Sequence, residues 1–271
     1  AYTPRPVIGV PVDVKSAGMD ALDSIIQMPY PSPIATVGID RADNAAILAA
    51  QFIGLHDDEV HKKVIELRKE YAQKVINSNE EIVQAIDRPF IENDFLRIKN
   101  LEINKAEIDE DAEECCKNKD AEVAIIVGRQ TDMGTAKKVT AILDRLKITH
   151  DTKVVCPIRS NKKFTNYVIT MKKAKIFSGI SSNSSQVTGG IVGLTARPVI
   201  GVPCTNENGD DYRLTVVSMP PGVPVATMAI NGAKNAGLFA AQILALTDAE
   251  LSAKLDAFRA EQTQKVLDAT I

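Results

Sequence analysis

The feature that most constrains this chain is an internal repeat. Residues 27–55, QMPYPSPIATVGIDRADNAAILAAQFIGL, match residues 218–246, SMPPGVPVATMAINGAKNAGLFAAQILAL, at 13 of 29 positions. The segment RPVIGVP also occurs twice, at Arg5–Pro11 and at Arg197–Pro203. Apolar residues downstream of both stretches recur at helical spacing, which predicts an amphipathic helix at the end of each repeat. A match of this extent predicts a duplicated structural unit.

Strand and helix signals alternate throughout the second repeat. Short apolar strands are expected at 122–127, 152–158, 175–180, 197–203 and 223–230, and helices at 131–146, 161–174 and 232–246. Alternation of this kind predicts a mainly parallel sheet with helices on both faces. The expected fold class is therefore α/β, a doubly wound, Rossmann-like three-layer α/β/α arrangement that is duplicated. Such sheets bind ligands beyond the carboxyl ends of their strands.

The repeat divides the chain into three parts. Residues 1–86, the first repeat, match only the rear half of the second repeat, which occupies residues 121–271. The charged residues 87–120 between them are expected to be a linker, with an acidic docking segment as the alternative. A half-unit would leave sheet edges bare, so the counterpart of residues 122–193 is expected on a longer natural chain or on a second polypeptide.

Composition argues against several classes of function. The formal net charge of −3 leaves no basic footprint for nucleic acid. No apolar run approaches the roughly 20 residues of a membrane span, and the first residues lack a secretory pattern, so a cytoplasmic protein is expected. Cys115 and Cys116 are interpreted as linker thiols rather than a redox pair. His56 and His61 at a helix start, and His150 in a turn, are expected at the surface.

The repeated residues resemble the 5-aminoimidazole ribonucleotide carboxylase family, which includes N5-carboxyaminoimidazole ribonucleotide mutase. In the first repeat the likeness rests on Gly18–Asp20, Ser24, Gln27–Pro29 and the helix from Asn44 to Leu55. In the second repeat it rests on residues 218–246. The tandem arrangement resembles the two-copy form of this enzyme found in some archaea.

The resemblance implies a step of de novo purine biosynthesis on the route to IMP. The family places a carboxyl group on carbon 4 of 5-aminoimidazole ribonucleotide, giving carboxyaminoimidazole ribonucleotide, without a metal or other cofactor. Phosphoribosylaminoimidazole carboxylase, a lyase also described as a decarboxylase, uses CO2 directly, whereas the mutase starts from the N5-carboxylated nucleotide. A His is the family's general acid and base, in a pocket closed to water. The implied small-molecule partners are the nucleotide and CO2 or bicarbonate.

The first family motif, Gly-Ser-x-Ser-Asp, binds the phosphate and ribose at a helix N-terminus. In the second repeat it reads GRQTD at residues 128–132. Asp132 is kept and Thr131 can replace one hydroxyl, so both are candidate substrate-binding residues, with a simple helix cap as the alternative. Arg129 stands where the phosphate-binding Ser belongs, and we expect it to exclude the nucleotide, with a second phosphate contact as the alternative.

The other two family motifs have lost their His in the second repeat. Ser-Ala-His-Arg reads CPIR at residues 156–159, so Arg159 remains to pair with a phosphate while Ile158 replaces the catalytic His. Ala-Ala-His-Leu-Pro-Gly reads SSQVTG at residues 184–189, with Gln186 at the His position. The second repeat is therefore expected to keep the fold without the chemistry.

In the first repeat, the residues that the resemblance places beside the pocket are Ser16, Gly18, Asp20, Gln27, Met28 and Pro29. The acid and base residues of this repeat fall in its absent front half, so the catalytic residues remain unknown. The chemistry is assigned to the first repeat once completed, and this chain alone is expected to be inactive. The alternative is a non-catalytic scaffold half of the same assembly.

Both repeats carry an Ala-rich helix, at residues 44–55 and 235–246, whose small side chains allow close packing. Together with the resemblance, these helices predict a homo-oligomer, expected to be a tetramer of two-copy chains. A dinucleotide-binding dehydrogenase is excluded by its motif, because no G-x-G-x-x-G follows residues 122–127.

Overall fold

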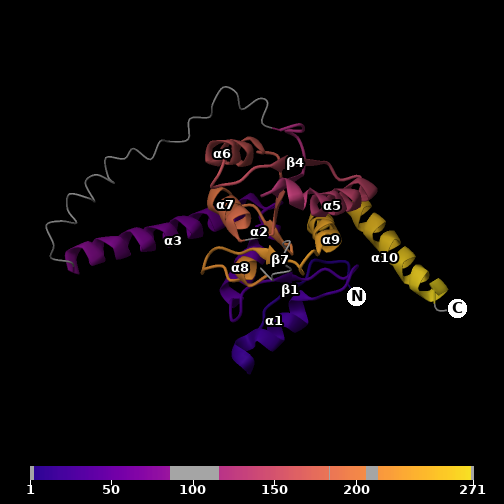
Figure 1. The fold of residues 1–271 in the computed structure, drawn as a ribbon, viewed down its shortest axis with the longest axis horizontal. Helices are drawn as coiled ribbons and strands as arrows, with labels where there is room; N and C mark the ends of the chain where they lie inside the picture. Colours follow the sequence, from indigo (N-terminus) through magenta and orange to yellow (C-terminus); the bar gives the residue numbers. More distant parts are fainter. Residues whose placement is uncertain (1–2, 86–115, 183, 206–212, 270–271) are drawn as a thin grey trace.

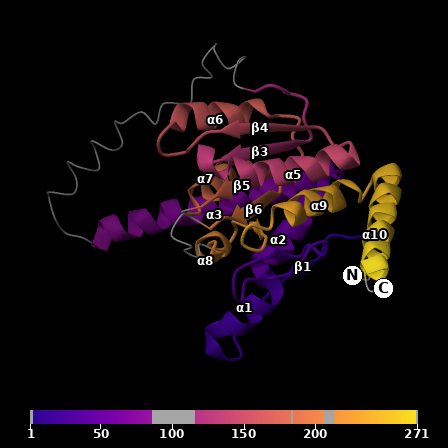
Figure 2. The same ribbon diagram turned by 45° about the vertical axis from the view of Figure 1, so that its right-hand side comes forward.

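A computed structural model of the chain describes residues 3–85, 116–182, 184–205 and 213–269. Its strands form one seven-stranded sheet in the order β1-β2-β7-β6-β5-β3-β4. Helices lie on both faces of this sheet (Figure 1, Figure 2). The mainly parallel α/β/α arrangement predicted from the sequence is confirmed. Within the described residues, no helix is long and apolar enough to cross a membrane.

Each repeat ends with the same order of elements, strand, helix, strand, helix and helix. In the first repeat these are β1 (Ile8–Gly9), the 3-10 helix Ser16–Gly18, α1 (Met19–Ile26), β2 (Ala35–Thr36), α2 (Ala42–Ile53) and α3 (Asp58–Ala85). In the second they are β6 (Val199–Pro203), α8 (Arg213–Val217), β7 (Ala226–Thr227), α9 (Ala233–Leu244) and α10 (Ala249–Ala269). The second repeat has a front half as well: β3 (Val123–Val127), the 3-10 helix Gln130–Asp132, α5 (Met133–Leu146), β4 (His150–Val154), α6 (Asn161–Thr170), β5 (Ile176–Ser181) and α7 (Gln186–Leu194).

The central strand β3 shows why the apolar runs of the second repeat form a covered sheet. Val123, Ile125 and Val127 belong to the core on the face covered by α5 and α9. Ala124 and Ile126 point to the opposite face, into the core formed with α6 and α7. Because side chains alternate between faces, a strand with helices on both sides must be apolar at every position.

The two repeats meet in the middle of the sheet. β2 and β7 are equivalent strands, yet they pair antiparallel with Thr36 opposite Thr227, whereas the other strand pairs of the described sheet are parallel. Equivalent strands that pair antiparallel are related by an approximate two-fold axis, as at the interface of a symmetric dimer. The chain is therefore built as an intramolecular dimer of its repeats.

Side-chain contacts across this seam are reciprocal. Asn44 Nδ2 donates to the carbonyl oxygen of Pro220 at 2.9 Å, and its repeat counterpart Asn235 donates to that of Met28 at 3.1 Å. Phe52 of α2 packs edge-on against Phe239 of α9, with ring centroids 5.8 Å apart. The side chains of both asparagines and both phenylalanines are buried, and these contacts join the two repeats in one body.

Three expectations from the sequence are wrong in detail. The strand expected at 152–158 is β4, which begins at His150 and ends at Val154, because its partner β3 ends at Val127 and Pro157 has no N–H to donate. His150 therefore lies in a strand, half-buried, rather than in a surface turn. The strand expected at 223–230 is reduced to the two residues of β7, which pair with β6 on one side and, at Thr227, with β2 on the other.

The two histidines of the first repeat agree with the expectation in part. His56 is exposed, as expected, although it lies in the turn before α3. His61 lies in the first turn of α3, as expected, but is partly buried. The boundaries of the linker remain a prediction, because residues 86–115, including Cys115, lie outside the described residues.

Candidate functional site

A cavity of about 290 Å³ opens at the carboxyl ends of the strands of the second repeat. The chain runs from β3 outward to β4 and then returns to β5 on the other side of β3. Loops after these strands diverge at such a switch point, which leaves a crevice. The residues that line it are Gly128, Arg129, Cys156, Ile158, Arg159, Ser181, Ser184, Gln186 and Val187.

Gly128 allows the close approach of the loops at this cavity. A Cβ atom at Gly128 would stand 2.9 Å from the Val187 side chain, so a larger residue would push α7 away. The Gly128 carbonyl oxygen accepts a hydrogen bond from Arg159 Nη2 at 2.8 Å. The loop after β3 thus binds the Arg159 guanidinium, the group that the resemblance predicts to bind a phosphate.

Asp132 and Thr131 lie outside this cavity. The Asp132 side chain is buried and accepts a hydrogen bond from Ser182 Oγ at 3.1 Å, while Thr131 is exposed. Asp132 stands at the N-cap position of α5 but makes no capping hydrogen bond with its side chain. The structure therefore brings Arg129 and Arg159 together with Ile158 and Gln186, but not with Asp132.

Ile158 and Gln186, at the two positions that the resemblance assigns to histidine, both border the cavity. The Ile158 side chain is 68% exposed at the rim, an unusual place for a large apolar group. Neither side chain can take or give a proton at neutral pH. The lining of this cavity therefore has no histidine for acid–base catalysis.

Cys156 is the cavity residue that sequence reasoning missed. Its thiol receives the backbone N–H of Arg159 at 3.5 Å and lies 4.0 Å from Gln186 Oε1. Burial acts to raise the pKa of this thiol, but hydrogen bonds from the side chain and backbone of Arg159 and from the backbone of Ile158 outweigh it, and the pKa is lowered overall. Its position directly before Pro157, at the first residue of the altered CPIR motif, was the signal available in the sequence.

The first-repeat candidates form two groups. Ser16 and Gly18 lie in a tight turn after β1 with positive φ angles of 53° and 73°, and Asp20 is exposed in the first turn of α1. A Cβ atom at Gly18 would stand 2.5 Å from the Ile39 side chain, so the turn needs glycine there. These three residues do not line the cavity of the second repeat.

The second group, Gln27, Met28 and Pro29, lies at the seam between the repeats. Gln27 and Pro29 are exposed, and the Met28 carbonyl oxygen accepts the hydrogen bond from Asn235. Two of the equivalent positions in the second repeat, Met219 and Pro220, accept hydrogen bonds from Asn44, so this segment contacts the other repeat in both directions. Within the described residues, no group of three His, Cys, Asp or Glu side chains is placed to hold a metal ion.

Most of the chain matches known proteins in sequence. The family AIRC, described as AIR carboxylase, matches residues 1–74 and 122–265. A Methanobrevibacter smithii protein named "Probable N5-carboxyaminoimidazole ribonucleotide mutase" is 64% identical over 248 residues, which are 92% of this chain and 73% of that protein. A Methanothermobacter thermautotrophicus protein of the same name is 41% identical over 94% of this chain and 74% of its own length.

Shorter proteins match about half of the chain. The N5-carboxyaminoimidazole ribonucleotide mutase of Vibrio vulnificus is 38% identical over 54% of this chain and 94% of its own length. The crystal structure of Treponema denticola PurE superposes with a TM-score of 0.50 at 23% identity, over 54% of this chain and 94% of its own. This last likeness concerns the fold alone.

Proposed function

This chain belongs to the AIR carboxylase family, and from that premise we propose that it acts in purine biosynthesis, where carbon 4 of 5-aminoimidazole ribonucleotide acquires a carboxyl group. The proposed donor is the N5-carboxylated nucleotide. The observation that carries this choice is the 64% identity with a protein named as a probable N5-carboxyaminoimidazole ribonucleotide mutase. Direct use of CO2 is the competing donor.

The reaction needs a proton to leave carbon 4 once the new carbon–carbon bond has formed, and hence a general base beside the ring. In the cavity of the second repeat, both positions that the resemblance assigns to histidine carry groups that cannot serve, Ile158 and Gln186. Arg159 is already bonded to Gly128, and Asp132 to Ser182. We therefore assign the second repeat a structural role, and the chemistry to a completed first repeat.

The first repeat contributes to that working pocket through its two loops. The turn at Ser16–Gly18 follows the carboxyl end of β1, the edge of the sheet where this fold binds ligands. Gln27, Met28 and Pro29 are held against the second repeat by Asn235. In this proposal the second repeat acts as a scaffold that positions these loops. The non-catalytic alternative assigns the same scaffold role to the second repeat.

A turnover assay tests the proposal. The protein to assay is this chain extended by a front half that carries Gly-Ser-x-Ser-Asp and Ser-Ala-His-Arg, with this chain alone as the matched control. We expect the extended protein to convert the N5-carboxylated nucleotide to carboxyaminoimidazole ribonucleotide, and the control to convert neither donor. Conversion of 5-aminoimidazole ribonucleotide and bicarbonate instead would identify the carboxylase. No conversion of either donor by the extended protein would favour the scaffold alternative.

A further inference from the structure

Another cavity, of about 420 Å³, lies between α3 of the first repeat and the segment that joins α7 to β6 in the second; we name it the α3–α7 cavity. None of the described residues that line it is acidic. Its polar lining consists of His61, Arg68, Lys69, Thr195 and Arg197. Because Arg197 precedes β6, this cavity lies at the amino ends of the strands, away from the cavity described above. Basic side chains thus gather at a place that the proposed chemistry does not use.

Arg68 is the basic residue of the α3–α7 cavity whose charge already has a partner. It donates from Nη1 to the Thr195 carbonyl oxygen at 2.8 Å and from Nη2 to that of Val192 at 2.5 Å. These carbonyls belong to the carboxyl end of α7, where backbone acceptors lack partners within the helix. The guanidinium therefore offsets the negative end of the helix dipole. Lys69, Arg197 and His61 are the groups that this leaves for a ligand.

The charges of Arg197 and His61 act on each other. Burial and the nearby positive charge of Arg197 lower the pKa of His61, whereas Asp58 acts in the opposite direction. Positive groups beside a cavity without an acidic lining repel one another, and an anion between them replaces that repulsion with attraction. A neutral His61 still has one ring N–H to donate to an anion.

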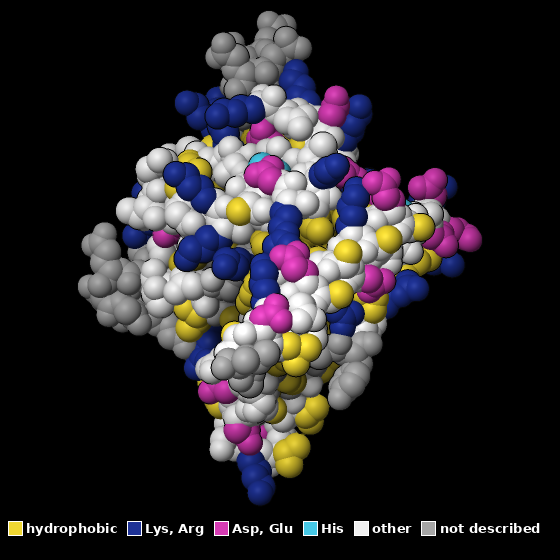
Figure 3. All heavy atoms as spheres, turned by 90° about the vertical axis from the view of Figure 1, so that its right-hand side faces the viewer, with side chains coloured by type: hydrophobic (Ala, Val, Ile, Leu, Met, Phe, Trp, Pro, Cys, Tyr) yellow, Lys and Arg dark blue, Asp and Glu magenta, His cyan; other side chains and the backbone are white. Residues whose placement is uncertain are grey.

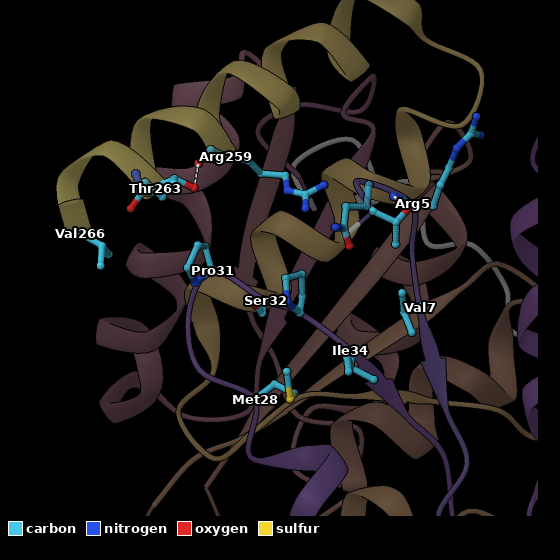
Figure 4. A pocket seen from close by; sticks show the side chains of 13 residues that line it. Arg5, Val7, Met28, Pro31, Ser32, Ile34, Arg259, Thr263 and Val266 are labelled. Carbon is cyan, nitrogen blue, oxygen red and sulfur yellow. Dashed lines mark hydrogen bonds between the residues drawn. The ribbon is translucent and has the colours of Figure 1, made fainter. Parts of the chain in front are cut away.

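The fold of the repeat does not require a positive charge at Lys69 or a histidine at His61. Their counterparts in α10, at the spacing that relates the two repeats, are Ala260 and Ser252. Neither counterpart lines the cavity beside α10, where Arg259 is the basic side chain that this helix contributes (Figure 4). Because α10 is helical with these residues, Lys69 and His61 are not explained by helix formation, and a role in binding accounts for them.

We propose that the α3–α7 cavity binds a small molecule that carries a phosphate group, with Lys69, Arg197 and His61 as the donors. A phosphate monoester has three strong acceptor oxygens and close to two negative charges, which matches three converging donors of this kind. Ile65 and Leu194 also line the cavity and favour a phosphate on an apolar carrier over the free ion. The bound molecule contacts both repeats at once. The proposal does not rest on the proposed function, because the cavity lies at the other edge of the sheet.

An NMR titration of the whole chain tests the site, with phenyl phosphate as the probe and inorganic phosphate as the second arm. We expect saturable shifts of the backbone amides near Lys69 and in residues 193–197, and tighter binding of phenyl phosphate than of inorganic phosphate. Equal affinities would support the site with the free ion as its ligand and overturn the apolar carrier.

The variant that tests the donors gives α3 the residues of α10 at both positions, His61→Ser with Lys69→Ala. We expect it to bind phenyl phosphate at least about tenfold more weakly, since two donors to an anion are lost. Lys62→Ala is the matched control. It also removes a lysine of α3 and also introduces the α10 residue, but Lys62 is exposed and does not line the cavity. Its affinity should be unchanged.

Three results would overturn the proposal. Shifts that do not saturate at millimolar phenyl phosphate, or an equal loss of affinity in Lys62→Ala, would mean a general attraction to a basic helix. Saturable shifts confined to the surroundings of Arg159 would place the anion in the other cavity. Circular dichroism checks that the variants are folded. If the double variant does not fold, Lys69→Ala alone replaces it, because Lys69 is exposed, and an unchanged affinity would then contradict the proposal.

Discussion

At the scale of single residues, two candidate ligand-binding groups of the second repeat are hydrogen-bonded within the protein. In the cavity, Arg159 donates to the carbonyl oxygen of Gly128, and outside the cavity Asp132 accepts a hydrogen bond from Ser182. The Cys156 thiol is the cavity group whose pKa is shifted by its neighbours.

The two buried cysteines should differ sharply in reactivity. The pKa of Cys156 is lowered, whereas burial raises the pKa of Cys204 to about 11. A lowered pKa means that the reactive thiolate forms at lower pH, so we expect iodoacetamide to label Cys156 well before Cys204 at pH 7. Arg159→Ala should move the labelling profile of Cys156 to higher pH, because it removes a hydrogen bond and a positive charge. Mass spectrometry of the labelled peptides checks this, and equal rates at the two cysteines would refute it.

At the scale of elements, the seam between β2 and β7 is what makes two repeats into one body. Beyond the strand pairing, Leu22 and Ile26 of α1 pack with Val217 of α8, and Arg213 of α8 forms an ion pair with Asp23 at 2.6 Å. Ile26 and Val217 are counterparts in the repeat, so here too equivalent positions meet across the axis. Such self-complementary contacts are the mark of a two-fold interface.

The seam asparagines offer a measurable test of this arrangement. Asn235→Ala removes the hydrogen bond to the Met28 carbonyl oxygen and leaves that acceptor without its donor, which should cost about 1–3 kcal/mol of unfolding free energy. Gln73→Ala removes a bond of the same kind on the exposed face of α3 and should change the free energy by less than about 0.5 kcal/mol. Urea unfolding monitored by circular dichroism compares the two. Equal effects would mean that the seam contributes no more than a surface contact.

Local sequence patterns predicted the elements that are held by local packing. β3 was evident as a short run of apolar residues, and α9 as a longer apolar and Ala-rich run that is repeated in the sequence. The ends of β4 were not predicted because they depend on where its partner β3 begins and ends. The pairing of Thr36 with Thr227 was not predicted because it depends on the two-fold axis between the repeats. The candidate site was predicted for Arg159 and Ile158, which follow a strand directly. The partner of Asp132, Ser182, is distant in sequence, so no local pattern identifies it.

At the scale of the whole molecule, α3 and α10 extend from the body on opposite sides (Figure 1). Each exposes an apolar pair at equivalent positions, Val75 and Ile76 in α3 and Val266 and Leu267 in α10, with exposed fractions between 49% and 67%. On the face that carries α10, hydrophobic side chains are interspersed with charged ones (Figure 3). Repeated apolar pairs on projecting helices are suited to contacts between molecules.

We therefore expect the chain to self-associate, with a tetramer as the proposed state. Replacing Val75 and Ile76 together with Asp should shift the sedimentation coefficient toward that of a smaller species, because two charges would have to be buried at the contact. Ser78→Asp, which adds a charge at an exposed site on the same helix, is the control and should leave the association unchanged. A parent chain that sediments as a monomer at micromolar concentration would contradict this expectation.

The central claim is that a two-repeat chain has one working pocket, supplied by a completed first repeat, and one that is blocked. Calorimetric titration with 5-aminoimidazole ribonucleotide measures this directly, because it counts bound nucleotides without requiring turnover. The account predicts one nucleotide per chain for the protein with a completed first repeat, and none for this chain alone. Two nucleotides per chain, or saturable binding to this chain alone that Arg159→Ala abolishes, would show that the second pocket still binds and would contradict the account.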